Sequence, residues 1–163
     1  MRAASPFTIE SWDANGRAVG VETGTPLGGA FIVRAVSGGD IEGRSEVLFA
    51  GAFSEEHGSG TYVAIDAFEG EILGRSGTVC FWHANTMRRG RPIEGSSHLV
   101  IVPDSGTGEL AGICGTGFIS AEGGEHELVL DVEFEEDGAS FDAEVIRGEV
   151  EAAPGAQAPG AED

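Results

Sequence analysis

Lysine is absent from this chain of 163 residues, and its nine basic residues, all arginines, are outnumbered by 28 aspartates and glutamates. The formal net charge at pH 7 is therefore −19. Nucleic acids and anionic membranes bind to basic patches, so we expect neither to be a partner of this protein. The charge predicts an acidic, solvated surface that keeps molecules apart, or an attraction for cations and basic partners.

Cysteine is scarce, and long apolar runs are missing. Cys80 and Cys114 are the only cysteines, and they lack the CxxC spacing and the neighbouring histidines of a zinc site. We therefore expect two reduced thiols, no metal and no cofactor. No apolar run approaches the length of a membrane span, and residues 1–12 lack the apolar core of a signal peptide. A soluble, cytoplasmic protein is expected.

Helical periodicity is missing as well, and the remaining pattern is that of an all-β protein. Short apolar runs recur at even intervals between turn signals, as in antiparallel sandwiches and barrels. Many of the 27 glycines stand inside these runs, which favours a coiled, closed sheet. We predict a single antiparallel eight-stranded barrel. The strand-like runs cover 7–12, 30–36, 41–53, 61–69, 72–83, 98–102, 110–119, 126–134 and 141–146.

Length and composition predict the domain organisation. A chain of this length with 40% hydrophobic residues is expected to form one domain with a real core. We assign residues 1–147 to the barrel. Residues 148–163 are rich in Ala, Pro, Gly and Glu, and we expect them to form a disordered acidic tail.

The stretch from Ser97 to Ile119 gives the clearest local prediction. An apolar run ends at the turn-forming sequence Pro-Asp-Ser-Gly, and a second run follows with three glycines spread through it. Glycines inside strands mark bulges, strong coiling or the close approach of another backbone. We therefore expect strand, tight turn and strand, with 99–103 paired antiparallel to 109–118.

Strand alternation selects the first candidate site residues. Over 126–134, His126 shares a face with Leu128, Leu130 and Val132, which must turn inward. His126 is therefore expected at the inner rim, either bonded to backbone or acting as a general base at a cavity mouth.

Tyr62 and Asp66 are the next candidates, and they share one face of the run over 61–69. The opposite face carries Val63 and Ile65, so both faces are largely apolar and the pattern leaves the inward one open. Tyr62 and Asp66 are too far apart along a strand to touch, but both can line one elongated cavity. Alternatively, Tyr62 lies at the rim and Asp66 pairs with an arginine.

Three further residues are candidates for ligand binding. Arg75 in Gly-Arg-Ser-Gly could hold a carboxylate in bidentate fashion, or form an ion pair with Asp66 or Glu109. His83 closes the run over 72–83, where it could reach a ligand or cap the strand. Glu109 could contact a ligand, or accept hydrogen bonds from backbone N–H groups of the turn.

Several of these segments together resemble a family of small uncharacterised bacterial proteins. The resemblance covers roughly 7–134, and its motifs are Tyr-Val-Ala-Ile-Asp at 62–66, Gly-Arg-Ser-Gly at 74–77, His83, Val-Pro-Asp-Ser-Gly-Thr-Gly-Glu-Leu-Ala-Gly at 102–112, and 124–126 with the following strand. That family is similar in fold to the allene oxide cyclase barrel, which implies eight antiparallel strands around a cavity. Related barrels include cyclases of natural-product pathways, so the resemblance permits isomerase or cyclase chemistry.

Three functional hypotheses follow. The first is a barrel that binds a small apolar ligand. The second is an isomerase or cyclase in the same cavity, with His126, Tyr62 and Asp66 as catalytic candidates. The third is a structural or homo-oligomeric module whose interior is filled by side chains.

Overall fold

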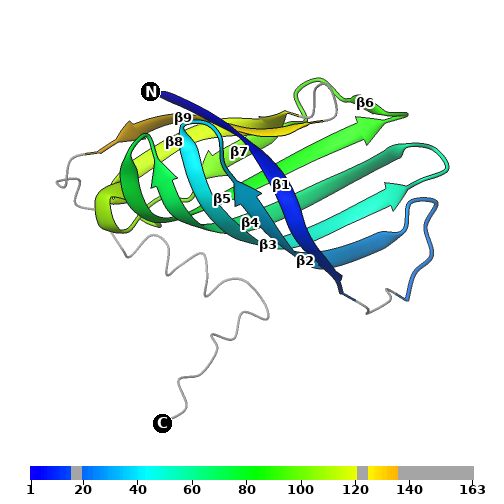
Figure 1. Cartoon of the computed structure of the whole chain (residues 1–163). Helices are drawn as coiled ribbons and strands as arrows, with labels where there is room; N and C mark the ends of the chain where they lie inside the picture. Colours follow the sequence, from blue (N-terminus) through cyan, green and yellow to red (C-terminus); the bar gives the residue numbers. More distant parts are fainter. Residues whose placement is uncertain (16–19, 121–124, 136–163) are drawn as a thin grey trace, which may run out of the picture.

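The computed structural model describes residues 1–15, 20–120 and 125–135, and these residues form an all-β structure (Figure 1). One 3-10 turn, η1 (Gly108–Leu110), is the exception, and no helix in the described ranges is long and apolar enough to span a membrane. The strands are β1 (Arg2–Ala14), β2 (Leu27–Val36), β3 (Ile41–Ser54), β4 (Ser59–Ile72), β5 (Arg75–Arg88), β6 (Arg91–Pro92), β7 (His98–Ile101), β8 (Ile113–Ser120) and β9 (His126–Phe134).

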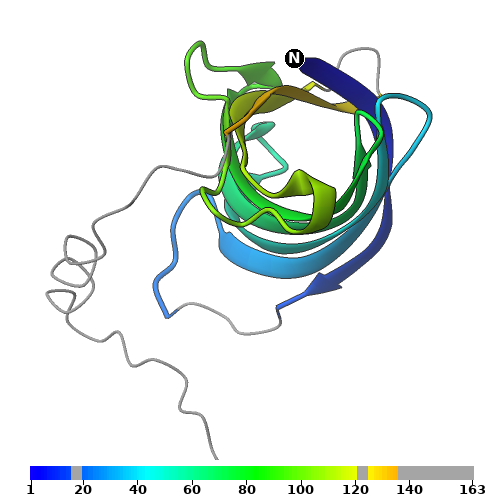
Figure 2. The ribbon, with the colours of Figure 1, turned by 90° about the vertical axis from the view of Figure 1, so that its left-hand side faces the viewer.

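Eight of the nine strands close into a ring. The sheet order is β4-β3-β2-β1-β9-β8-β7-β5-β6, and β4 also pairs with β5, which joins the two ends of the row. All of these pairings are antiparallel, and the short β6 extends the sheet beside β5. Figure 2 looks along the axis of this ring. The predicted all-β class is confirmed, and so is the antiparallel pairing of the strands.

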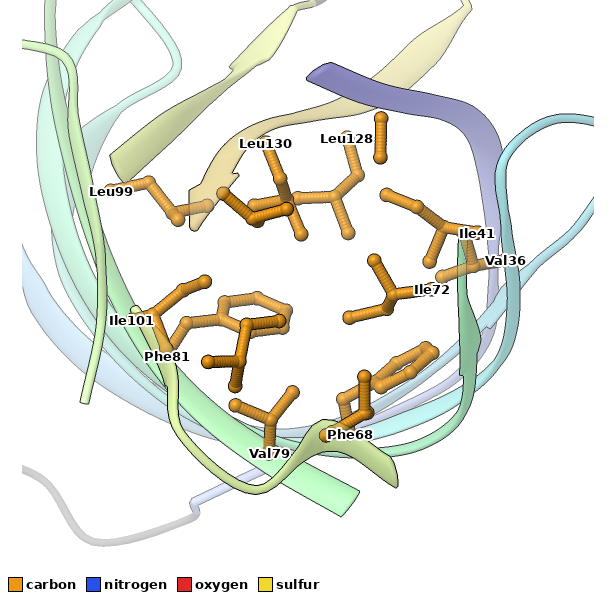
Figure 3. Packing of buried hydrophobic residues seen from close by; sticks show 14 of the residues in the cluster. Val36, Ile41, Phe68, Ile72, Val79, Phe81, Leu99, Ile101, Leu128 and Leu130 are labelled. Carbon is orange, nitrogen blue, oxygen red and sulfur yellow. The ribbon is translucent and has the colours of Figure 1, made fainter. Parts of the chain in front are cut away.

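One half of the ring interior, here called the packed half, is filled by side chains. Fifteen buried apolar residues form a single cluster there, and they come from most of the strands and from η1 (Figure 3). Nine of its larger members are 2% exposed or less. They are Phe68, Phe81, Ile41, Ile72, Leu99, Ile101, Leu110, Ile113 and Leu130.

The other half, here called the pocket half, contains a second and smaller cluster. Four buried residues form it, and Phe49 and Tyr62 pack against them while remaining partly exposed. The four are Ala30, Ile32, Val47 and Ala64.

The connection between β7 and β8 corrects one prediction. Leu99 pairs with Gly117 and Val100 with Thr116, so the predicted antiparallel pairing is confirmed. The turn is not tight, however, and β8 begins only at Ile113 because η1 precedes it. The connection instead packs on β5, where the Ser105 hydroxyl accepts a hydrogen bond from the Cys80 backbone N–H at 3.0 Å.

Two other segments that lie outside the predicted strand-like runs also belong to strands. The predicted runs begin only at residue 7, but β1 starts at Arg2, and Ala3 and Ser5 are fully buried. The predicted runs also leave out 84–92, but β5 runs to Arg88 and β6 follows the turn. Propensity underestimated these strands because their neighbours in the ring supply the hydrogen bonds and the packing.

The strand glycines lie where two backbones approach each other. A Cβ atom built on Gly117 would lie 2.1 Å from the carbonyl oxygen of Val129 on β9. Gly43 and Gly70 face each other across β3 and β4, both at φ +157°, with the Phe68 ring close to each. The glycines therefore permit the coiling and close approach that the sequence predicts.

Some predictions fall outside the described residues. These are the strand-like run at 141–146, the domain boundary between 147 and 148, and the tail 148–163.

Candidate functional site

Four inward-facing polar residues lie between the two halves of the interior. Arg34 on β2, Ser45 on β3, Asp66 on β4 and His83 on β5 each contribute one side chain, and none is more than 7% exposed. On each of β2 and β4 the inward neighbours belong to different clusters, for example Ala64 on one side of Asp66 and Phe68 on the other. We call these four residues the polar layer.

Short contacts link three members of this layer. Arg34 Nη1 donates to Asp66 Oδ2 at 2.9 Å, and His83 Nε2 lies 3.0 Å from Asp66 Oδ1. Arg34 Nη1 is also 3.2 Å from His83 Nε2. The Asp66 carboxylate thus binds a cation with one oxygen and an imidazole with the other, which explains how a charged group remains at 0% exposure.

Tyr62 extends the network toward the pocket half. Its hydroxyl lies 3.3 Å from His83 Nδ1, and the two rings meet edge to face at 5.4 Å. Because the Asp66 carboxylate can only accept, we assign the imidazole proton to Nε2, from which it is donated to Asp66. In the neutral ring Nδ1 then accepts from the Tyr62 hydroxyl, which gives the chain Tyr62, His83, Asp66.

Tyr62 is a phenol and not a phenolate at neutral pH. Burial raises the pKa of its hydroxyl above the ordinary value of 10, and the Asp66 charge raises it further, while Arg34 opposes both. The group is therefore a hydrogen-bond donor or a general acid rather than a base.

The pocket half contains a cavity of about 250 Å³ that reaches this network. Arg34, Tyr62, Asn85 and His126 are its polar lining residues. The rest of the lining is apolar apart from Gly60, and consists of Phe7, Ile9, Trp12, Ile32, Phe49, Phe53, Met87 and Ile119.

A β-bulge in β1 completes the aromatic lining. The register between β1 and β2 shifts between Ile9 and Ser11, so Glu10 is an extra residue in the strand. Ile9 and Trp12 consequently both line the pocket although strict alternation would put them on opposite faces. The Trp12 ring meets the Phe49 ring edge on at 5.0 Å.

The structure brings Tyr62, Asp66 and His83 of the predicted residues together. Tyr62 and Asp66 do not touch each other, as expected, but His83 bridges them. His83 is not at the end of its strand, because β5 continues to Arg88, and so it does not act as a cap. Asp66 pairs with an arginine, as one alternative proposed, but the partner is Arg34 and not Arg75.

His126 also lies at the pocket, at a distance from the network. It begins β9, is exposed, lines the pocket and packs against Phe7 with a ring separation of 5.4 Å. Its predicted position on the face of Leu128 and Leu130 at a cavity rim therefore agrees with the structure, while its role stays a prediction.

Arg75 and Glu109 lie elsewhere. The Arg75 guanidinium stacks over the Phe134 ring at 3.9 Å, and it makes no ion pair with either predicted partner. Glu109 accepts a hydrogen bond from the Ser76 backbone N–H at 3.0 Å, and so it fastens η1 to the start of β5. Neither residue lines the pocket.

Sequence reasoning missed Arg34, the only cation in the polar layer. The signal was nevertheless present, because Arg34 interrupts an apolar run in the same phase as Ala30, Ile32 and Val36. A charged residue at an inward position needs a partner or a function. Within the described ranges no cluster of His, Cys, Asp and Glu is suited to a metal ion, and a guanidinium beside a single carboxylate repels one.

Comparison with known proteins identifies the family but not a function. No curated protein matches the chain. A crystal structure of a protein with unknown function from the DUF3224 family, from Shewanella oneidensis MR-1, is similar at 30% sequence identity with a TM-score of 0.73. That similarity covers 83% of this chain and 98% of the Shewanella chain. The model of the family described as "protein of unknown function (DUF3224)" matches residues 3–132, and the chain therefore belongs to the DUF3224 family.

Proposed function

We propose that this protein binds a small, mainly apolar molecule in the pocket half of the ring. The observation that carries the proposal is the cavity of about 250 Å³, which aromatic and aliphatic side chains line around four polar residues. Ligand pockets commonly combine an apolar wall with a few polar groups that fix orientation. The allene oxide cyclase-like barrel that the sequence suggests is part of this proposal, because such barrels enclose cavities of this kind.

The contrast with the packed half supports a pocket over a filled, purely structural interior. Strands β3 and β4 place Ile41 and Phe68 in the packed half but leave Phe49 and Tyr62 partly exposed in the pocket half. A purely structural ring would gain stability by filling both halves.

Isomerase or cyclase chemistry is the second candidate function. The chain Tyr62, His83, Asp66 favours it, because a phenol that borders an apolar pocket can give a proton to a bound molecule. His83 and Asp66 orient that hydroxyl, because the imidazole proton lies on Nε2 toward Asp66 and Nδ1 accepts from Tyr62, and the proton given up returns from the product or from solvent. His126 at the rim is the second candidate acid–base group, and Asp66 acts through His83.

The binding proposal can be tested with the neutral fluorescent probe N-phenyl-1-naphthylamine. The probe should fluoresce strongly on addition of the protein, and Ile9→Trp should weaken its binding at least tenfold because the new ring occupies the pocket. Thr8→Trp is the matched control, since Thr8 is exposed on β1 next to Ile9 but does not line the pocket. Equal loss in both variants, or no binding by the unmodified protein, would contradict the proposal.

A further inference from the structure

Arg34 has hydrogen-bond donors that the protein itself does not use. Nη1 donates to Asp66 Oδ2 and lies 3.2 Å from His83 Nε2, which carries the imidazole proton and therefore does not accept from it. Nε is buried and has no partner among the described residues. The side chain is 9% exposed and lines the pocket, so Nη2, which also makes no hydrogen bond within the described ranges, is the donor that a bound molecule can reach.

The guanidinium lies over the Phe7 ring at 5.1 Å, but an N–H group that borders an apolar pocket without an acceptor is still costly, because it has lost its hydrogen bonds to water and gained none in exchange. A ligand oxygen would remove that cost. The Tyr62 hydroxyl lines the same pocket, and its contact with His83 at 3.3 Å is the longest in the network, so it can turn toward the same oxygen.

The charges favour a neutral oxygen over an anion. Asp66 already balances Arg34 at 2.9 Å, and the whole chain carries a net charge of −19, which repels anionic molecules. A carboxylate ligand would place a second anion on a single guanidinium. A ketone, aldehyde or ester carbonyl accepts the same hydrogen bonds without that repulsion.

We infer that the ligand is a neutral, mainly apolar molecule with one carbonyl oxygen, and that Arg34 Nη2 and the Tyr62 hydroxyl hold this oxygen. The inference rests on the proposed function, because it assigns the ligand class of the same pocket. It explains why an arginine, and not only a carboxylate–histidine pair, is buried beneath an apolar cavity.

Three matched ligands separate this inference from the proposal on which it rests. They are 2-acetylnaphthalene, 2-ethylnaphthalene, which has the same shape without an acceptor, and 2-naphthoate, each titrated against bound N-phenyl-1-naphthylamine. The ketone should displace the probe at roughly five- to a hundred-fold lower concentration than the hydrocarbon, the range expected for a hydrogen bond in a desolvated site. The naphthoate should bind more weakly than the ketone.

Each other result has one meaning. Equal affinity of ketone and hydrocarbon would overturn the carbonyl site while leaving the pocket in place. Tightest binding by the naphthoate would overturn the neutral ligand class. No displacement by any of the three would defeat both the inference and the proposed function.

Arg34→Lys tests the residue directly, since lysine keeps a cation beside Asp66 but lacks Nη2. The ratio of ketone to hydrocarbon affinity should fall toward one, and the downfield ¹³C shift of a labelled carbonyl on binding should be lost. Arg44→Lys is the matched control, because Arg44 pairs with Glu10 at 3.0 Å in an exposed position. The ratio is the readout because a general loosening of the fold weakens both ligands alike. An unchanged ratio in Arg34→Lys would overturn the assignment.

Discussion

The packed half and the pocket half of the ring share most of their strands, but they differ in how the interior is used. In the packed half Phe81 on one side of the ring and Ile72 on the other both point into the interior, and they are 1% and 0% exposed (Figure 3). In the pocket half Trp12 and Phe53 keep 53% and 38% of their surface exposed. The comparison teaches that β2 to β5 contribute to a stabilising packed core at one end and line an unfilled cavity at the other. The polar layer marks the boundary between them.

The largest effect on stability should come from a substitution in the polar layer, which separates the two halves. Asp66→Asn keeps the shape of the side chain but leaves the buried Arg34 cation without its counter-charge. We expect a loss of about 3–5 kcal/mol in the free energy of unfolding, as for other buried pairs that lose one partner. Urea denaturation measures it.

The double variant Arg34→Met with Asp66→Asn is the control for that loss. It removes the unpaired cation and should recover a good part of the stability. The outcome that contradicts this is a double variant whose loss of unfolding free energy equals the sum of the losses measured for Asp66→Asn and Arg34→Met alone. Such a result would show that the stability of the polar layer does not depend on the ion pair.

Truncation in the packed half should have the next largest effect. Leu130→Ala creates a cavity at a site with 0% exposure, and we expect it to cost about 2–5 kcal/mol. Ile9→Ala in the pocket half, where Ile9 is 47% exposed, should cost clearly less, because that surface is already open. Similar losses in the two variants would remove the distinction between the two halves.

The Tyr62 hydroxyl allows a pH test with its own optical signal, since the chain has only one tyrosine. Its pKa is raised in the folded protein, so the folded state holds this proton more tightly than the unfolded state. Stability should therefore fall as the pH rises above about 10, the unfolded value, and the fall should be shallower in Tyr62→Phe. Phenolate absorbance should titrate above about 10 in the native protein and near 10 in urea. A native titration at or below the urea value would disprove the burial effect.

The smallest effect on stability should come from His126→Ala at the rim. His126 is exposed, and its ring packs against Phe7 at the rim of the pocket. The melting temperature should therefore change little. If His126 contacts a bound molecule, affinity for 2-acetylnaphthalene should still fall several-fold. Stability lost without any change in affinity would show that the residue is structural.

The strands were predicted well where the apolar face of the local pattern is also the face that points into the ring. β9 was predicted with its bounds, because one of its faces is apolar from Leu128 to Phe134 and the other carries acidic residues. β4 shows the opposite case. Val63 and Ile65 are apolar yet 48% and 50% exposed on the outside, so alternation could not tell the inward face of that strand.

The candidate site was predicted only in part. Tyr62, Asp66 and His83 were named one by one, but their connection through His83 depends on the register between β4 and β5, which pairs Ala64 with His83. Local sequence does not encode that register, because it is fixed by hairpin geometry and ring closure. The bulge that brings Trp12 into the pocket is likewise a product of pairing with β2.

The pairing of β1 with β9 has a consequence for how the chain folds. Residues 2–7 meet residues 126–131, so the ring can close only after almost the whole described chain has been made. The hairpins from β2 to β5 join neighbours through short connections and can form early, whereas the closing seam must bring distant segments together. Until it does, the edges of β1 and β9 remain unpaired, and this interval is when the protein is most exposed to wrong strand pairing with other chains.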